Sequence, residues 1–572
     1  MKRVVTLLAL VILVVALVMV SSLPPETKVT APAPASTVRG AFHIHSDRSD
    51  GSGGVDAIAS FAARAGLHFI ILTDHGDGTR PPDAPAYRSG VLTIDGVELN
   101  TTGGHYAAMD LPASPYPIAG TPEDVIEDVH RLGGFGIAAH PGSPRPSLSW
   151  QGWETAFDGL EWINGDSEWR DEPRAPIVRA LLTYLLRGPQ SLATLLDRPD
   201  SVLARWDALS AQRKIVGIAG SDAHARLGLR QQTDPDIASI HVPLPGYEAS
   251  FRAFSNHVVL AAPFSGDAAA DARLLLEAIR GGHVYSVIDA IASPGSLTFT
   301  AASGSQVTST DGSRSAQMGD ALPLAGEVSL RASANAPPGT ALMLLRNGQR
   351  LHEVVDGPLE MKDVTEPGAY RIEAYTTGAP GGPPVPWLVS NPIYLGLDLR
   401  EKIVDRVLTA RIPARTAEAA TESGTNDTSR IDVGPPLDAR ARTFAGDAAI
   451  NWTFALSPGV ANGQFAAVPI PVSPGLGGFD AVQFRVWSPR PIRAWAQLRA
   501  VGNTERWGAT FYADAETRTV TIPFAKFRPI GATSSVKPPL AQAQFLLLVV
   551  DTLNTLPGSR GNLTLSEVAF VK

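Results

Sequence analysis

The sequence predicts a multidomain protein, in which an α/β domain over residues 38–293 precedes two all-β domains over residues 294–397 and 431–572. Three observations predict this arrangement. In the first region, short apolar runs alternate with helical patterns, which is typical of a parallel sheet or barrel. Seven short segments of the same region end an apolar run in a residue of a metal-binding type. After residue 294, short apolar and polar runs alternate among many Gly, Pro, Ser and Thr residues, which indicates strands and turns.

The α/β region opens with a strand expected over residues 38–45 and a helix expected over 54–65, where the apolar residues follow helical spacing. Residues 68–73 form a nearly continuous apolar run, as expected of a strand buried on both faces. A helix is expected over 121–132, with Thr121 as its N-cap and Pro122 in its first turn. Further strands are expected at 91–97, 105–109, 135–139, 159–163 and 215–219. In barrels of this kind the active residues lie at the carboxyl ends of the strands.

Residues 166–213 interrupt the alternation with two helical stretches, at 176–186 and 201–212. We interpret them as a helical insertion that forms a lid or cap. Residues 247–285 return to a helix–loop–helix pattern, followed by a strand-like run at 283–287.

The C-terminal half predicts two β domains. Residues 294–397 are expected to form a β-sandwich, and residues 398–430, which are charged and then rich in Thr, Ala and Ser, are expected to form a linker. Residues 431–572 are expected to form a jelly roll. With Trp452, Trp487, Trp495 and Trp507, this region resembles the galactose-binding-like jelly rolls of carbohydrate-active proteins, which implies carbohydrate contact.

The N-terminus is typical of an export segment. Lys2 and Arg3 precede an apolar run over residues 4–20, so that residues 1–22 form either a cleaved signal peptide or an uncleaved membrane anchor. Both alternatives place the body of the protein outside the cytoplasm, as a periplasmic, extracellular or membrane-anchored protein. Residues 23–37 are rich in Pro, Ala and Thr and are expected to form an extended linker.

The amino-acid composition limits the kinds of functional site and partner that the chain can have. Of the 12 histidines, 11 lie between residues 43 and 283, and histidine is the commonest metal ligand. The chain has no cysteine, which excludes disulfides, thiolate metal sites and a cysteine nucleophile. The net charge of −8 argues against a nucleic-acid partner, because nucleic-acid-binding domains are usually basic.

The seven segments supply nine candidate metal ligands: His43, His45, Asp50, His75, Glu98, His105, His140, Asp222 and His224. His43 and His45 are two residues apart at a strand end, so their side chains can share a face and reach one metal. Glu98 offers two oxygens, which can bridge two cations, and Asp222 can complete the first site. His105 and His140 suit a second site, whereas Asp50, His75 and His224 suit a third.

The motifs HIHSDRSDG, LTDHGDG, GVELNTTGGHY, AAHPG, GLEWING and GSDAH occur in this order within residues 43–224. Through them, residues 38–293 resemble the PHP (polymerase and histidinol phosphatase) superfamily, and within it the exported metallohydrolases of the CehA/McbA type. The resemblance implies a distorted (β/α)7 barrel that holds two or three divalent metal ions (Mn, Fe or Zn), with roles for the nine residues that match those above. Some relatives have His where this chain has Asp50, and a carboxylate there favours Mn or Fe over Zn or leaves the third site empty.

The expected activity is metal-dependent hydrolysis of phosphoesters, or of related carboxyl or carbamate esters, by a metal-activated hydroxide. Asp74 or Asp222 can accept a proton, and His224 or His75 can donate one. Alternatively, Asp74 only supports His75. Asn164 can orient substrate or water. Arg48, Arg145 and Arg226 either bind an anionic group of the substrate or are ordinary surface charges.

A second hypothesis is a cell-surface protein that binds a carbohydrate or another partner through its β domains, while the barrel is a non-catalytic scaffold. The complete ligand set favours the hydrolase. Its substrate is expected to be a small-molecule or glycan-linked ester, which the insertion at 166–213 selects. Trp150, Trp153, Trp162 and Trp169 either line a substrate cleft or pack in the core.

Overall fold

The computed structural model divides the chain into two compact units. The first comprises Met1–Pro112 and Thr121–Lys402, and the second Ala113–Gly120 and Ile403–Lys572. The structure describes residues 20, 23–29, 36–228, 241–303, 314–324, 327–399, 437–438, 450–459, 463–473, 475–500, 505–531 and 533–572. Nearly all of the expected export segment, and all but the first two residues of the expected linker at 398–430, lie outside the described residues. Within the described ranges, no helix is both long enough and apolar enough to cross a membrane.

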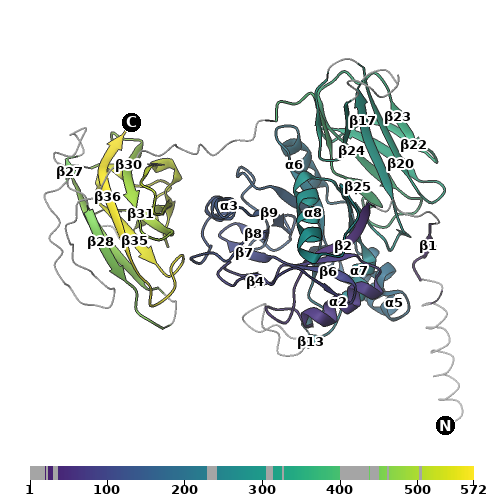
Figure 1. The fold of residues 1–572 in the computed structure, drawn as a ribbon, viewed down its shortest axis with the longest axis horizontal. Coiled ribbons are helices and arrows are strands. Elements are labelled where there is room, and N and C mark those ends of the chain that lie inside the picture. The colour runs from purple at the N-terminus through teal and green to yellow at the C-terminus, as the bar shows by residue number, and fades with distance from the viewer. Residues whose placement is uncertain are drawn as a thin grey trace, which may run out of the picture. The chain divides into compact units, whose positions relative to one another are not determined.

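The α/β region of the first unit is built on one mixed sheet (Figure 1). Its strands are β2 (Thr37–Ile44), β3 (Phe69–Leu72), β4 (His75–Gly76), β5 (Ala86–Arg88), β6 (Val91–Asp95), β7 (Val97–Thr101), β8 (Gly104–Met109), β9 (Phe135–Ala139), β10 (Gly159–Asn164) and β11 (Val216–Ala223). Strand β2 pairs in parallel with β3, and β3 with β6, while β4 pairs in parallel with β7. From β7 the sheet continues through β8, β9 and β10 to β11, and β11 pairs in parallel with β2.

The expected distorted (β/α)7 barrel is not confirmed. Strands β7, β8 and β9 pair antiparallel, and β7 and β8 are joined by a tight hairpin rather than a crossover helix. The sheet is therefore mixed, with few helices in its connections. Its parallel pairs still direct the carboxyl ends of β2, β3, β10 and β11 to one edge, because parallel strands share their polarity.

The strands of this sheet form because their sequences suit burial on both faces. Every residue of β3 (FIIL) and β9 (FGIAA) is buried. Helices α2 (Val55–Arg64) and α3 (Pro122–Arg131) connect β2 to β3 and β8 to β9. The predicted start of α3 is confirmed: Pro122 is its first residue, and Thr121 accepts a hydrogen bond from the backbone N–H of Asp124 in a capping box.

The insertion at 166–213 corresponds to three helices, of which the first begins one residue before it: α4 (Gly165–Glu168), α5 (Arg174–Ala193) and α6 (Asp200–Ser210). Helix α5 is kinked at Arg187, where φ is −144° and ψ is 64°. The kink is caused by Pro189, which lacks the N–H needed to continue the helical ladder.

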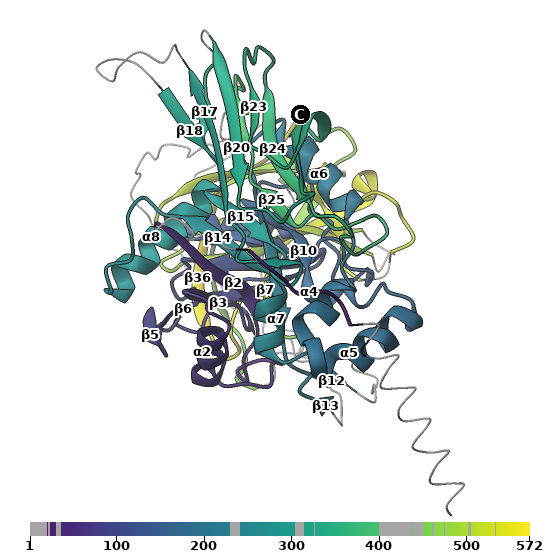
Figure 2. The same ribbon diagram turned by 90° about the vertical axis from the view of Figure 1, so that its right-hand side faces the viewer.

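Two further helices in the described part of the first unit are α7 (Tyr247–Ala253) and α8 (Ala268–Gly281). In Figure 2, α7 lies between α2 and α5 along one side of the unit, and it contacts both. Strand β14 (Ser255–Val259) pairs antiparallel with β2, and β1 (Thr27–Lys28), inside the expected linker 23–37, pairs with β16 (Ala292–Ser293).

Residues 294–397 belong to the same compact unit as the α/β region, because β15 (Val284–Val287) pairs with β25 (Leu388–Ser390). This region contains a four-stranded sheet in the order β18-β17-β20-β23. Its apolar side chains pack against those of β21, β24 and β26, which belong to the mixed sheet. The strands are β17 (Leu297–Ser303), β18 (Arg314–Gln317), β19 (Ala321–Leu322), β20 (Val328–Ala334), β21 (Ala341–Arg346), β22 (Gln349–Val355), β23 (Leu359–Met361), β24 (Gly368–Tyr375) and β26 (Ile393–Leu395).

The second unit is a β-sandwich of a six-stranded sheet, β27-β29-β35-β31-β32-β34, and a four-stranded sheet, β28-β36-β30-β33. Apolar side chains from both sheets, such as Trp452, Phe484 and Leu548, form its core. Its strands are β27 (Leu437–Asp438), β28 (Ile450–Ala455), β29 (Phe465–Ser473), β30 (Ala481–Trp487), β31 (Ile492–Ala500), β32 (Arg506–Ala513), β33 (Arg518–Pro523), β34 (Arg528–Pro529), β35 (Ala543–Asp551) and β36 (Arg560–Val571). The specific jelly-roll connectivity stays a prediction.

Candidate metal centre

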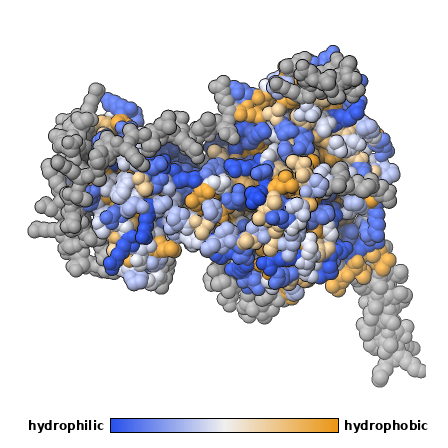
Figure 3. Space-filling view, viewed as in Figure 1, coloured by the Kyte–Doolittle hydropathy of each residue, from blue (hydrophilic) through white to orange (hydrophobic). Residues whose placement is uncertain are grey.

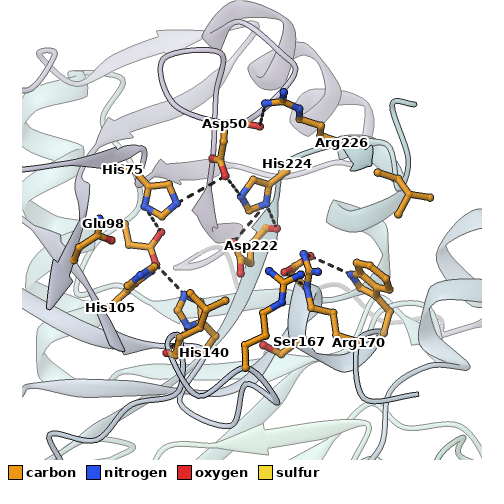
Figure 4. A pocket seen from close by; sticks show the side chains of 16 residues that line it. Asp50, His75, Glu98, His105, His140, Ser167, Arg170, Asp222, His224 and Arg226 are labelled. Carbon is orange, nitrogen blue, oxygen red and sulfur yellow. Dashed lines mark hydrogen bonds and ion pairs between the residues drawn. The ribbon is translucent and has the colours of Figure 1, made fainter. Parts of the chain in front are cut away.

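The structure brings all nine candidate ligands to one place at the edge of the mixed sheet, where several of them line a pocket (Figure 4). They come from β2, β4, β7, β8 and β11 and from the loops that follow β2, β9 and β11. Four overlapping groups place their donor atoms within 4.8 Å of one another. These groups are His45–Asp50–His75–His224, His43–Glu98–His140, His43–His45–Asp222 and His75–Glu98–His105.

Glu98 lies at the centre of the cluster. Its Oε1 is 2.8 Å from Nδ1 of His105 and 2.9 Å from Nε2 of His140. Its Oε2 is 3.3 Å from each of three ring nitrogens, which are Nε2 of His43, Nε2 of His45 and Nδ1 of His75. The two carboxylate oxygens therefore face two different groups of imidazoles, which is the arrangement expected of a residue that bridges two cations.

Two aspartates serve the other side of the cluster. Asp222 Oδ1 lies 3.4 Å from Nε2 of His43 and 3.3 Å from Nε2 of His45. Asp50 lies 3.3 Å from Nδ1 of His45 and 3.2 Å from Nε2 of His224. Asp50 is further from His75, at 3.8 Å. The third predicted group is thus the most loosely assembled of the three.

Three of the histidines are held in the tautomer that a metal ligand needs. Nδ1 of His140 donates to the carbonyl of Leu148, and Nδ1 of His224 donates to the carbonyl of Asp222. Nδ1 of His43 donates to Glu161 at 2.6 Å. Because each Nδ1 carries the proton, each Nε2 presents its lone pair to the cluster. These three residues therefore suit a divalent cation. The Nδ1 atom of His75 suits one as well, because it is buried and has no hydrogen-bond partner among the described residues.

Glu161 is a residue of the site that the sequence analysis missed. Besides the proton of His43, its carboxylate accepts hydrogen bonds from the backbone N–H of His140 at 2.6 Å and from the Asn164 amide at 2.7 Å. It is only 1% exposed in a strand that is otherwise mainly apolar. A single carboxylate inside a buried strand was the available signal, because an ionised group in such a place needs partners.

The backbone is strained where it presents ligands. His43 (φ 65°), His140 (φ 32°) and Asp222 (φ 46°) all have positive φ, which is uncommon for residues other than glycine. Such strain persists only where the surrounding structure enforces it, and it concentrates at functional sites. A glycine is also required nearby, since a Cβ on Gly220 would lie 2.0 Å from Oε1 of Glu161.

The buried carboxylates of the cluster need positive charge close to them, and the pKa values of the neighbouring groups are shifted accordingly. Burial by itself raises the pKa of Glu98, but the charge of His43 and the hydrogen bonds from His105 and His140 hold this pKa well below its usual range. Burial lowers the pKa of His224, yet Asp50 and Asp222 outweigh it and raise the pKa to about 10. Protonated imidazoles thus provide the positive charge that bound cations would otherwise provide to these carboxylates.

The pocket beside the cluster has a volume of about 460 Å³. Arg145, Arg170 and Arg226 line it, together with Trp169. Arg170 and Trp169 come from the segment between α4 and α5, and Arg170 pairs with Asp166 at 2.6 Å. Of the tryptophans that the sequence suggested for either a substrate cleft or the core, Trp169 lines the pocket, whereas Trp150 and Trp162 are buried in the core. Arg170 has no recognisable signal in the sequence, since an Arg within a helical insertion belongs to no motif.

Three of the predicted catalytic and substrate-binding residues lie outside the pocket lining. Arg48 pairs with Asp83 and Asp95, so it is not directed at the cluster. Asn164 caps α4 and donates to Glu161. Asp74 accepts hydrogen bonds from the backbone N–H and hydroxyl of Ser46 and from the hydroxyl of Ser49, which leaves it supporting the loop that carries Asp50.

No family model matches the chain, and no curated protein matches it. Among solved structures, it is similar to a two-domain protein from Bacteroides vulgatus that contains a predicted PHP-like metal-dependent phosphoesterase, with 14% identity over 64% of this chain and 99% of the other and a TM-score of 0.29. A proposed metal-dependent phosphoesterase from Bifidobacterium adolescentis shows 16% identity over 39% and 95% of the two chains, with a TM-score of 0.21. A family 11 carbohydrate-binding module from Clostridium thermocellum shows 14% identity over 23% and 86%, with a TM-score of 0.16. Likenesses this distant do not establish the family or the activity of this chain.

Proposed function

We propose that the protein is a metal-dependent hydrolase of phosphoesters, or of related carboxyl or carbamate esters. The observation that carries the proposal is the convergence of six histidines and three carboxylates, far apart in the sequence, in which the two oxygens of Glu98 face five of the imidazoles. A structural metal site needs about four ligands and closes around its ion. Nine ligands beside an open pocket indicate instead a centre with room for a substrate.

The described residues would hold at least two cations. His43, His45 and Asp222 form one donor group, and Glu98 links it to a second that includes His105 and His140. When bound, such cations supply Lewis acidity and lower the pKa of water, as in hydrolases with two metals. A third group around Asp50 and His224 remains part of the proposal, with Mn, Fe or Zn as the candidate metals.

The chain's own side chains would bind the substrate and move protons. Arg145, Arg170 and Arg226 place guanidinium groups around the pocket, where they can hold an anionic group of the substrate. Asp222 and His224 both line the pocket and are positioned to exchange a proton with a bound substrate. Asp74 is better suited to holding the Asp50 loop than to proton transfer, since Ser46 and Ser49 occupy its oxygens.

We further propose that the protein belongs to the PHP superfamily, with the exported CehA/McbA-type metallohydrolases as its nearest type, and that it acts outside the cytoplasm. The ordered motifs and the Lys-Arg-apolar N-terminus support this assignment. The competing hypothesis, a binding protein with a non-catalytic barrel, predicts bound metal without turnover.

The test combines elemental analysis with a panel of chromogenic phosphomonoester, phosphodiester and aryl-ester substrates in Mn, Fe and Zn. Glu98→Ala and His43→Ala should each lose bound metal and abolish hydrolysis, because both residues face several imidazoles. Glu154→Gln, a change at an exposed carboxylate, is the control and should behave as the wild type. Wild-type turnover in Glu98→Ala would exclude the proposal, and stoichiometric metal without turnover would favour the binding protein.

A further inference from the structure

Helix α5 exposes an apolar face to solvent. The face consists of residues at i, i+3, i+4, i+7 and i+8, a spacing that places them on one side of a helix: Val178, Leu181, Leu182, Leu185 and Leu186. They are 48–88% exposed, which is unusual for a contiguous set of large aliphatic side chains. Figure 3 shows apolar side chains gathered at the lower right, where α5 lies in Figure 1.

The opposite side of α5 fixes how this face is directed. Ala180 and Thr183 are buried, and the hydroxyl of Tyr184 accepts a hydrogen bond from the backbone N–H of Gly246, just before α7. The helix therefore cannot turn its leucines inward without breaking its contact with α7.

The charge of α5 is entirely positive. Arg174, Arg179 and Arg187 lie within it, and its sequence contains no Asp or Glu. A helix with leucines on one face and only basic charges beside them has the character of helices that lie in the interface of anionic bilayers. It is too charged to resemble an ordinary membrane-spanning segment.

A separate contact places α5 beside the N-terminal apolar run. At the kink of α5, Arg187 donates a hydrogen bond to the backbone carbonyl of Pro24. The following residues are fixed to the body, because β1 pairs with β16 and the backbone N–H of Val29 donates to Ser293 at 2.9 Å. The apolar run ends at Val20, four residues before Pro24, so its end lies within about 14 Å of Pro24 at the reach of an extended chain.

We propose that the exposed face of α5 is a membrane-contact surface, which inserts its leucines into the interface of a bilayer with anionic headgroups. The apolar run at residues 4–20 and this face would then meet the same bilayer, and α5 would hold the body of the protein against it. The inference rests on α5 and the Pro24 contact and does not depend on the proposed hydrolysis.

The test uses the absence of cysteine from the chain. Full-length Leu185→Cys and, as the matched control, Val355→Cys on β22 are labelled with an environment-sensitive nitrobenzoxadiazole fluorophore; both positions are exposed in the first unit. The proteins are reconstituted with phosphatidylcholine–phosphatidylglycerol vesicles that contain doxyl-labelled lipid. We expect a blue shift and quenching at position 185 only. Equal responses at the two positions would overturn the proposal.

A second comparison separates the lipid surface from a second copy of the chain. The double change Leu181→Glu and Leu182→Glu, in the 185-labelled protein, should abolish quenching by doxyl lipid without affecting the fold, because both side chains are exposed. Contact between two copies would instead produce the blue shift without vesicles, in step with a dimer in analytical ultracentrifugation. That outcome would also refute the membrane contact.

Discussion

At the scale of single residues, the site depends on the candidate metal ligands and equally on the side chains that hold those ligands in position. The carboxylate of Glu161 holds the ring of His43, the backbone of His140 and the amide of Asn164 at once. It thereby fixes the orientation of one ligand and the strained backbone of another. Such supporting partners commonly change metal affinity when they are mutated.

Glu161→Gln should lower metal affinity by about 10- to 100-fold, because a neutral amide accepts the His43 proton more weakly than a carboxylate and has only one acceptor oxygen for His43 and the backbone of His140. Competition with a chromogenic chelator measures the affinity. Glu154→Gln is again the matched control, with the same chemical change at an exposed position. Equal affinities for the two variants would contradict the role given to Glu161.

His257 predicts a pH dependence of stability outside the metal centre. Burial, with the charges of Arg39 and His68, lowers the pKa of His257 to about 3. The unfolded value is about 6.5, so the folded state holds His257 neutral, and its contribution is lost as the pH falls below about 6.5. Between pH 7 and pH 5, wild type should lose about 2 kcal/mol more stability than His257→Phe. Denaturant unfolding at both pH values checks this, and parallel losses would contradict it.

At the scale of elements, a buried ion-pair network joins the helical insertion to the β-rich part of the first unit. Arg371 of β24 forms two hydrogen bonds with Asp207 of α6, at 2.7 and 2.8 Å, and a third with Glu373 at 2.6 Å. Arg371 is 2% exposed, so its charge depends on these partners. The insertion that lines the pocket is therefore held by a residue 164 positions further along the chain.

Arg371→Met should destabilise the first unit by about 3–5 kcal/mol, because it leaves Asp207 buried without its cation and leaves Glu373 with Arg198 alone. Arg350→Met removes an exposed Arg that pairs with Glu353 and should change stability by less than about 1 kcal/mol. Tryptophan fluorescence during denaturant unfolding can follow both variants, since Trp206 lies beside Arg371. Similar midpoints for the two would show that the network is not structural.

At the scale of the whole molecule, the metal centre joins five strands and three loops of the mixed sheet. Three carboxylates and six imidazoles there come from segments spread over residues 43–224. A cation bound at this point would hold these segments together, so it would stabilise the first unit as a ligand that binds only the folded state.

Removal of metal with a chelator should lower the thermal stability of the protein, by about 2.7 kcal/mol if the metal had been present at 100 times its dissociation constant. Adding Mn, Fe or Zn back should restore it. In Glu98→Ala, the chelator should have little further effect, because the central carboxylate is gone. Differential scanning calorimetry measures all three. A chelator effect of the same size in Glu98→Ala would place the metal elsewhere.

The sequence by itself determined the ligand types, their order and their positions after apolar strands, because histidines and carboxylates at strand ends are recognisable without coordinates. It also determined the start of α3, since capping is local. The tertiary structure alone decided what distant residues do to one another. It assigned Glu161 to His43, directed Arg48 away from the pocket and brought in Arg170. It also made the sheet mixed, because pairing partners depend on contacts between segments that no local pattern specifies.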